Sequence, residues 1–257
     1  MEPVLIKISG NLAGDERSLQ QISSFAQRQI TSGRPVVIVH GGGPQINALS
    51  KRLGVEVKQI AGRRVTDPAA LDVLLYTVGG LVNKQLVASL RTLGLNAVGL
   101  TGIDGNLTRS HKRPPLDING TDVDFGHVGE FDDIDPALVN TLLAGHYLPV
   151  IGCLTWSEKD GILNINADTF AIHLARATGC NELIMLMSPQ AVLDSHRQPL
   201  STLNRESWTS GVHDGWITDG MQPKLLTGFE ALENGISKVI LTNPDGLEKN
   251  NGTQLVH

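Results

Sequence analysis

The chain has 257 residues, of which 40% are hydrophobic and 18% are charged, so it is long enough to bury one large core or two small ones. Its formal net charge of −5 excludes the basic surface with which proteins wrap nucleic acid or dock on anionic lipid. No continuous apolar run approaches the roughly 18 residues that cross a bilayer. No secretion signal opens the sequence, and two cysteines are too few for a disulfide framework. We therefore expect a cytoplasmic protein with no membrane partner and no nucleic-acid partner.

Apolar runs rich in valine, isoleucine and leucine alternate along the chain with stretches of helical periodicity. The predicted strands are residues 4–8, 36–40, 97–100, 147–151, 183–187 and 238–241. The predicted helices are residues 19–30, 46–53, 68–93, 136–143, 167–177 and 221–232. This alternation is typical of βαβ units around a buried sheet, so we predict an α/β fold with a central, mainly parallel sheet.

Residues 106–133 interrupt the alternation, because they contain short alternating pieces, two consecutive prolines and no helical period. We expect a β-hairpin excursion there. No repeat, low-complexity tract or flexible linker divides the sequence. Residues 1–257 are therefore predicted to form a single domain, with a functional division near residues 170–180.

The glycines of Gly41-Gly42-Gly43 lie between a predicted strand and a predicted helix. Backbone N–H groups and the helix N-terminus would converge there and bind phosphate or carboxylate; the alternative is a plain strand-to-helix turn. A second loop of this kind, Ser9-Gly10-Asn11, follows the first strand. Because the carboxyl ends of parallel strands form the ligand crevice of an open sheet, we expect the two loops to share one anion site.

This glycine pattern matches neither common nucleotide-binding motif: Ile46 occupies the third glycine position of the dinucleotide pattern, and no Walker A segment is present. A phosphate site would therefore take its lysines from elsewhere. Lys7, inside an apolar strand, and Lys224, in the first turn of a helix, are the candidates, since each cation lies in an unfavourable place. Asp168 is a candidate to orient them. Each has an alternative without a function. Lys7 could reach out to solvent at a sheet edge, Lys224 could be a solvated lysine, and Asp168 could be an ordinary carboxylate at a helix start.

Two adjacent arginines, Arg63 and Arg64, lie in a polar loop, and an arginine fork there suits a substrate carboxylate. The alternative is that both are solvated, and the sequence leaves open which one points inward. The histidines show no metal-ligand spacing, and no metalloprotease or serine-hydrolase motif is present. We therefore expect no metal site made by the protein, and we interpret His40 and His173 as core or crevice-lining residues.

Seven short motifs, spread in order over nearly the whole chain, resemble the amino-acid kinase family, and in particular its N-acetylglutamate kinase branch. The motifs are Lys7-Ile8-Ser9-Gly10-Asn11, Val39-His40-Gly41-Gly42-Gly43, Gly62-Arg63-Arg64-Val65-Thr66-Asp67, Gly80-Leu81-Val82-Asn83-Lys84, Gly126-His127-Val128-Gly129, Asn164-Ile165-Asn166-Ala167-Asp168 and Asp219-Gly220-Met221-Gln222-Pro223-Lys224. The resemblance implies a three-layer αβα sandwich. It also implies an N-terminal lobe of about residues 1–178 that binds acylglutamate and a C-terminal lobe of about residues 179–257 that binds nucleotide.

The resemblance further implies that ATP phosphorylates the side-chain carboxylate of an N-acylated glutamate, above all N-acetyl-L-glutamate, to an acyl phosphate on the route to arginine. Lys7, Asp168 and Lys224 would be catalytic. The substrate-binding residues would be Gly42, Gly43, Arg64 and Asn164. The phosphate- and nucleotide-binding residues would be Gly10, Asn11, Gly41, Ser188, Gly220 and Met221. Mg²⁺ would arrive with the nucleotide.

Two segments depart from the family pattern. Ser9 precedes Gly10 where the family commonly has two glycines, and Ser188, Pro189 and Ala191 stand in a loop where the family carries an aspartate and a glycine beside the nucleotide. Pro189 also removes an N–H donor. Two alternatives stay open: a kinase for N-succinylglutamate or an aminoadipate-type substrate, and a non-catalytic regulatory homologue with impaired nucleotide binding.

The predicted helix 68–93 is apolar on more than one face. Its apolar residues include Leu74, Leu75, Val78, Leu81 and Val82. Either the sheet of the same chain covers them all, or a second subunit covers part of the helix. We predict a homodimer with this helix at or near the interface.

Overall fold

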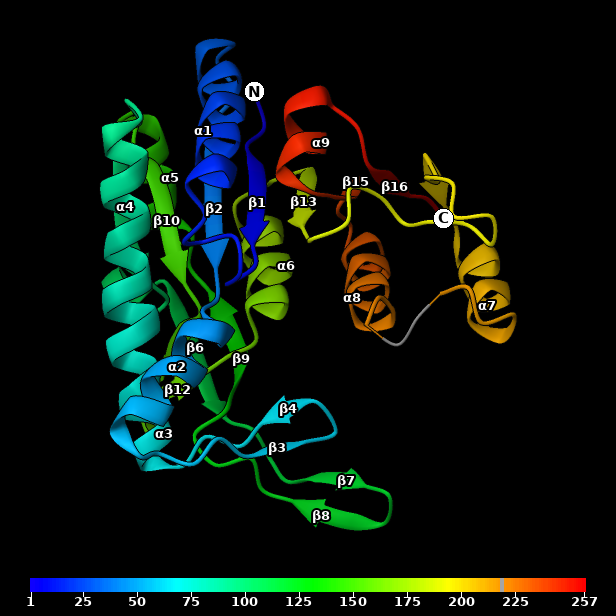
Figure 1. The fold of residues 1–257 in the computed structure, drawn as a ribbon. Coiled ribbons are helices and arrows are strands. Elements are labelled where there is room, and N and C mark those ends of the chain that lie inside the picture. Colours follow the sequence, from blue (N-terminus) through cyan, green and yellow to red (C-terminus); the bar gives the residue numbers. More distant parts are fainter. Residues whose placement is uncertain (218–219) are drawn as a thin grey trace.

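The computed structural model describes residues 1–217 and 220–257, and an eight-stranded sheet forms its centre (Figure 1). In order across the sheet, the strands are β14 (Thr202–Leu203), β16 (Thr253–Leu255), β15 (Lys238–Thr242), β13 (Glu182–Leu186), β1 (Val4–Ile8), β2 (Val36–His40), β10 (Leu148–Gly152) and β5 (Ala97–Thr101). All neighbouring pairs are parallel except β15 and β16. The predicted mainly parallel sheet is confirmed, and it runs without a break across the predicted lobe division near residue 178.

Helices cover both faces of this sheet. Because successive side chains of a strand point to opposite faces, β1 sends Leu5 into one hydrophobic cluster and Val4, Ile6 and Ile8 into another. The cluster that contains Leu5 is completed by α5 (Ala137–Ala144), α6 (Ala167–Ala177) and α8 (Gln222–Glu233). The opposite cluster is completed by α1 (Glu16–Thr31), α4 (Asn83–Thr92) and α9 (Pro244–Lys249). The result is the three-layer αβα sandwich that the resemblance implied.

Residues 68–92 form one long helix, which consists of α3 (Pro68–Leu74), a π-helical segment (Leu75–Val82) and α4. By length and composition this helix could cross a membrane. It nevertheless contains no continuous apolar run of the length that the sequence analysis considered, because Asp72, Asn83 and Lys84 interrupt its apolar residues. The helix packs on the sheet through side chains that are at most 2% exposed: Leu74, Val78, Val82, Leu86 and Leu90. Its apolar face belongs to the core of the sandwich.

The predicted excursion at residues 106–133 is confirmed as two nested antiparallel pairs. Strands β6 (Thr108–Lys112) and β9 (Gly129–Ile134) form the inner pair, and β7 (Leu116–Ile118) and β8 (Thr121–Val123) form the outer hairpin. A third hairpin joins β3 (Gln59–Ile60) to β4 (Arg63–Arg64). The hairpins β3–β4 and β7–β8 extend beyond the carboxyl ends of β1 and β2 in Figure 1, so irregular segments gather at that edge of the sheet.

The remaining elements lie around this frame. They are α2 (Gly43–Leu53), a 3₁₀ turn (Asp104–Asn106), β11 (Leu154–Ser157), β12 (Gly161–Asn164) and α7 (Arg205–His213). The sequence analysis did not predict β11, β12, β14, β16, α7 or α9. Most of them are short, and α7 buries only Gly211, so an apolar period is nearly absent from it.

Candidate functional site

The two glycine loops meet at the carboxyl ends of β1 and β2, which pair in parallel register up to Ile8 and His40. A methyl group added to Gly10 would lie 3.0 Å from the backbone nitrogen of Gly43 and 2.8 Å from Cδ of Pro44. The side-chain amide of Gln45 donates to the carbonyl oxygen of Gly10 over 2.7 Å. The two loops therefore form one continuous backbone surface, as the sequence predicted.

This surface has the donors of an anion site. Helix α2 begins at Gly43 with Gly42 as its N-cap, and no side chain caps the first turn. Among the residues that the structure describes, the N–H groups of Gly42 and Gly43 have no acceptor. Gly41 lies against α6, since an added methyl group there would contact Cβ of Ala167 at 3.4 Å. Free N–H groups at a helix N-terminus bind phosphate or carboxylate oxygens.

Lys7 and Asp168 form an ion pair beside these loops. Alternation along β1 places Lys7 on the same face as Leu5, against α6, and its Nζ atom lies 2.6 Å from Oδ1 of Asp168. The side chain of Asn166 caps α6 by accepting from the N–H groups of Asp168 and Thr169. The two charged side chains are 13% and 24% exposed, so each offsets part of the desolvation cost of the other.

Lys224 lies in the first turn of α8, where its ammonium group donates to the carbonyl oxygen of Gly220 over 3.1 Å. Within residues 1–217 and 220–257, no ion pair joins it to Asp168. The expected bridge from one carboxylate to both lysines is therefore not formed in this conformation, because Lys224 has a local acceptor four residues earlier. Asp219, the first residue of the quoted motif, lies outside the described residues, as does Thr218.

A cavity of about 670 Å³ lies beside Met221, in the C-terminal half of the chain. Its walls include Pro189, Ala191, Val192, Trp216 and Ile217. Two of the residues that depart from the family pattern thus line it. Two other expected nucleotide-binding residues are exposed: Ser188, which follows β13, and Asn11, which lies in the loop after β1. The walls also include the charged or polar residues Asp194, Ser195, Arg197 and Asp214, so the cavity combines apolar surface with polar groups, as small-molecule sites do.

A third group of candidate residues, Arg64 and Asn164, is held by hydrogen bonds to other segments. The guanidinium group of Arg64 donates to the side-chain oxygen of Asn47 on α2 over 2.6 Å, and burial lowers the pKa of Arg64. Asn164 donates to the hydroxyl of buried Thr66 over 3.0 Å. Arg63 is exposed. The structure therefore turns Arg64, and not Arg63, toward the helix that begins at the glycine surface.

Sequence reasoning missed three parts of this region. His40 is buried, as expected, but its hydrogen bond to buried Asn83 was not foreseen. Nor was the hydrogen bond by which Thr66 supports Asn164. Gly126 has φ +74°, and a methyl group on it would approach the carbonyl oxygen of Thr66 to 2.3 Å, so only glycine fits that contact. The one available signal was that His40, Thr66, Asn83 and Gly126 all lie within the quoted motifs.

Comparisons with known proteins agree with this architecture. The family model "Amino acid kinase family" matches residues 2–243. An acetylglutamate kinase of Parabacteroides distasonis is 36% identical over 98% of this chain and 98% of its own length. An acetylglutamate kinase of Methanopyrus kandleri is 37% identical over 84% of this chain and 89% of its own length. The solved structure of an N-acetylglutamate synthase from Neisseria gonorrhoeae superposes with a TM-score of 0.82 at 20% identity, covering 100% of this chain and 59% of that one. With a family match over most of its length and full-length relatives above one-third identity, the chain belongs to the amino acid kinase family.

Proposed function

We propose that this protein is an ATP-dependent acetylglutamate kinase, which transfers the γ-phosphoryl group of ATP to the side-chain carboxylate of N-acetyl-L-glutamate. A carboxylate oxygen forms the new bond to phosphorus, the bond from phosphorus to the β–γ bridging oxygen breaks, and ADP leaves with that oxygen. The full-length relatives named acetylglutamate kinase support this activity. The observation that carries the proposal is the Lys7–Asp168 ion pair beside the joined glycine loops.

The chemistry of this transfer needs positioning and charge stabilisation more than it needs a base. The substrate carboxylate is already an anion, and negative charge spreads over the phosphoryl oxygens in the transition state. The ammonium group of Lys7 and the N–H groups of Gly42 and Gly43 would stabilise that charge. Asp168 would keep Lys7 charged and oriented. Lys224 would exchange its local contact with Gly220 for the phosphates of ATP.

The other two clusters would hold the reactants on either side of this centre. Arg64 would bind the α-carboxylate of the substrate through its guanidinium fork, and Asn164 would bind the amide or carboxylate oxygens. The cavity beside Met221 would hold the nucleoside of ATP. Its wall residues Pro189 and Ala191 set the shape of the nucleotide half, so ATP affinity is the property they affect first.

Mg²⁺ is part of the proposal as a companion of the nucleotide. The donors on the glycine surface are N–H groups, and the carboxylate that the described residues place beside it, Asp168, is paired with Lys7. Such a donor set binds phosphate oxygens rather than a cation, so the phosphates of ATP would hold the ion. Mg²⁺ would supply further neutralisation of the phosphate charge.

The proposal also includes a two-fold homodimer. Tyr76 and Leu81 on the long helix are 59% and 49% exposed, while the other side of this helix packs on its own sheet. Strand β5 lies at the edge of the sheet next to this helix. An exposed apolar strip beside an unpaired strand edge is a surface that a second copy can cover, and light scattering tests that assembly.

The activity is tested by trapping the acyl phosphate with hydroxylamine. Purified protein is incubated with ATP, Mg²⁺ and N-acetyl-L-glutamate, with N-succinylglutamate, N-acetylated aminoadipate and unacylated glutamate in parallel. A hydroxamate from N-acetyl-L-glutamate above the other acceptors supports the proposal. A hydroxamate mainly from another acylated acceptor moves the substrate to that class. No product from folded protein, together with acylglutamate binding but no ATP binding by calorimetry, would favour a regulatory homologue.

A further inference from the structure

A fully buried histidine stands directly before the glycine surface, and the mechanism described so far does not use it. His40 is the last residue of β2 and is 0% exposed. Alternation along β2 puts Val37 and Val39 on the α6 face of the sheet and Ile38 on the α4 face. The side chain of His40 therefore points toward α4, where it meets Asn83.

Both ring nitrogens of His40 have a partner. Nε2 lies 3.0 Å from the side-chain nitrogen of Asn83, and Nδ1 lies 3.0 Å from the carbonyl oxygen of Gly41. An amide NH₂ group only donates, so Nε2 accepts. A carbonyl oxygen only accepts, so Nδ1 carries the hydrogen and donates it to Gly41. The two partners therefore select one tautomer.

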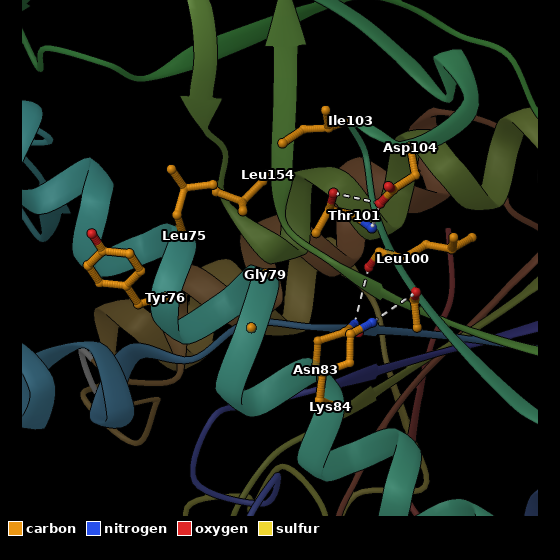
Figure 2. Close-up of a pocket in the computed structure, with 12 residues that line it drawn as sticks. Leu75, Tyr76, Gly79, Asn83, Lys84, Leu100, Thr101, Ile103, Asp104 and Leu154 are labelled. Carbon is orange, nitrogen blue, oxygen red and sulfur yellow. Dashed lines mark hydrogen bonds between the residues drawn. The ribbon is translucent and has the colours of Figure 1, made fainter.

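The orientation of the Asn83 amide follows from its other contacts. Its oxygen accepts from the ammonium group of Lys84 over 3.1 Å. Its nitrogen also faces the carbonyl oxygens of Val150 at 2.9 Å and Leu100 at 3.1 Å, so these two carbonyls and Nε2 of His40 share the two amide hydrogens. An ammonium group cannot accept and a carbonyl cannot donate, so the reverse orientation of the amide would place like groups together. Figure 2 shows Asn83 and Lys84 side by side on the long helix, with Asn83 bonded to Leu100.

The sheet leaves room for this amide at Gly99 of β5. A methyl group on Gly99 would lie 2.1 Å from the side-chain oxygen of Asn83 and 3.0 Å from Nζ of Lys84. Any other residue at this position would push Asn83 away from the sheet and from His40. The close approach of β5 to α4, and with it the contact between Asn83 and His40, therefore depends on glycine at position 99.

The histidine in turn orients a peptide group of the anion site. In a trans peptide the C=O of one residue and the N–H of the next point in opposite directions. When His40 holds the carbonyl oxygen of Gly41, it therefore also sets the direction of the N–H of Gly42. That N–H has no acceptor among the described residues and lies at the start of α2. Burial lowers the pKa of His40 to about 4, so the ring is neutral near pH 7 and the tautomer argument holds.

We propose that Asn83 is a positioning residue for phosphoryl transfer, which fixes the Nδ1–H tautomer of His40 and thereby aims the N–H of Gly42 at the transferring phosphoryl group. The inference rests on the proposed kinase activity for its kinetic consequence. Its structural part, the tautomer and the orientation of one peptide group, does not depend on that activity. The two parts therefore have separate tests.

The kinetic test uses Asn83→Leu, which keeps the side-chain size and removes the donor and the acceptor. We expect kcat in the hydroxylamine assay to fall at least about 10-fold, since loss of one preorganised donor costs about 10²–10³. The KM for N-acetyl-L-glutamate should stay within about 3-fold, because an interaction made only in the transition state is lost. Thr178→Val is the matched control, because it removes another buried hydrogen bond, 2.7 Å long to Leu174, at the opposite end of α6. A variant Asn83→Leu that matches this control in kcat overturns the proposal.

Two variants of the histidine separate positioning from packing. His40→Asn keeps an N–H group near the position of Nδ1, whereas His40→Leu removes every donor. We expect His40→Asn to retain more of the wild-type kcat than His40→Leu, at similar thermal stability. Equal kcat values in the two variants would contradict a role for donation to Gly41.

The structural test needs no turnover. Long-range ¹H–¹⁵N NMR of histidine-labelled wild type should show His40 with hydrogen on Nδ1 at pH 7; hydrogen on Nε2 would overturn the proposal even if the enzyme is active. Should the wild type form no hydroxamate, titration with ATP and Mg²⁺ replaces the assay, because ATP carries the phosphoryl group that Gly42 would contact. A shift of the Gly42 amide resonance that is lost in Asn83→Leu supports the positioning role, and a shift of equal size in both proteins refutes it.

Discussion

Nζ of Lys7 lies 2.6 Å from Oδ1 of Asp168. This ion pair links β1, in the central sheet, to α6, in one of the helical layers, at the carboxyl end of the strand. A lysine in an apolar strand needs an anionic partner, and the capped first turn of α6 supplies it. The pair therefore stabilises the fold when no phosphate is near. It also keeps an ammonium group at the position where phosphoryl charge develops.

We predict that Asp168→Asn lowers kcat by about 10² or more, because Lys7 loses the charge that orients it. The KM for N-acetyl-L-glutamate should change little. Asp133→Asn is the control, since Asp133 pairs with Arg109 on the exposed surface and such pairs contribute little. Hydroxamate formation at saturating substrates measures both variants. If Asp168→Asn keeps kcat within about 3-fold of wild type, Asp168 has no orienting role.

We predict that Lys224→Ala lowers kcat by about 10²–10³, because its charge would act on the transferring phosphoryl group. Calorimetric binding of N-acetyl-L-glutamate should stay near the wild-type affinity. Among the described residues Lys224 has one hydrogen bond, to the carbonyl oxygen of Gly220, and no ion pair, so the substitution should have little effect on folding. Unchanged turnover would remove Lys224 from the mechanism.

We predict that Arg64→Ala raises the KM for N-acetyl-L-glutamate at least about 10-fold with a small effect on kcat, because binding is lost in the ground and transition states alike. Arg63→Ala is a matched control from the adjacent position, since Arg63 is exposed and Arg64 is bonded to Asn47. Steady-state kinetics with varied acylglutamate measure both. Equal effects of the two substitutions would show that the orientation of Arg64 does not select the substrate.

We predict a pH dependence of stability that originates in His40. Burial, with a smaller effect of nearby Lys84, lowers the pKa of His40 from 6.5 to about 4, so between these values the unfolded chain binds a proton that the folded chain does not. The free energy of unfolding therefore falls as the pH drops from 6.5 toward 4, by up to about 3 kcal/mol. Urea unfolding of wild type and His40→Asn at pH 7 and pH 4.5 measures it. Parallel losses in both proteins would assign the effect elsewhere.

Much of the fold could be predicted from the sequence, because local periodicity and burial agree there. Strands β1 and β2 and helix α6 have the predicted bounds, since each is a short apolar run or an amphipathic stretch with clear ends. The glycine loops could also be placed together, because the ends of neighbouring parallel strands coincide. Lys7 was a candidate for a separate reason, namely that a charge in an apolar strand needs a partner, and Asp168 was a candidate because the lysines needed an anionic residue to orient them.

The rest depended on contacts between distant segments. His40 and Asn83 are 43 residues apart, and their contact requires both the register of β2 and the path of the long helix over Gly99. The local sequence pattern does not predict how the long helix crosses the sheet. The choice between Arg63 and Arg64 depended on a hydrogen bond to α2. Helix α7 escaped prediction because Gly211 is its one fully buried residue, so its sequence lacks a clear apolar period.

The most direct test of the account follows the atom that receives the phosphoryl group. N-acetyl-L-glutamate labelled with ¹⁸O in its side-chain carboxylate is incubated with the protein, ATP and Mg²⁺, and the products are observed by ³¹P NMR. The account predicts an acyl phosphate resonance displaced by bridging ¹⁸O, formed together with ADP, and no such displacement when only the α-carboxylate is labelled. Release of unlabelled inorganic phosphate without an acyl phosphate, or ¹⁸O displacement from the α-label, would contradict it.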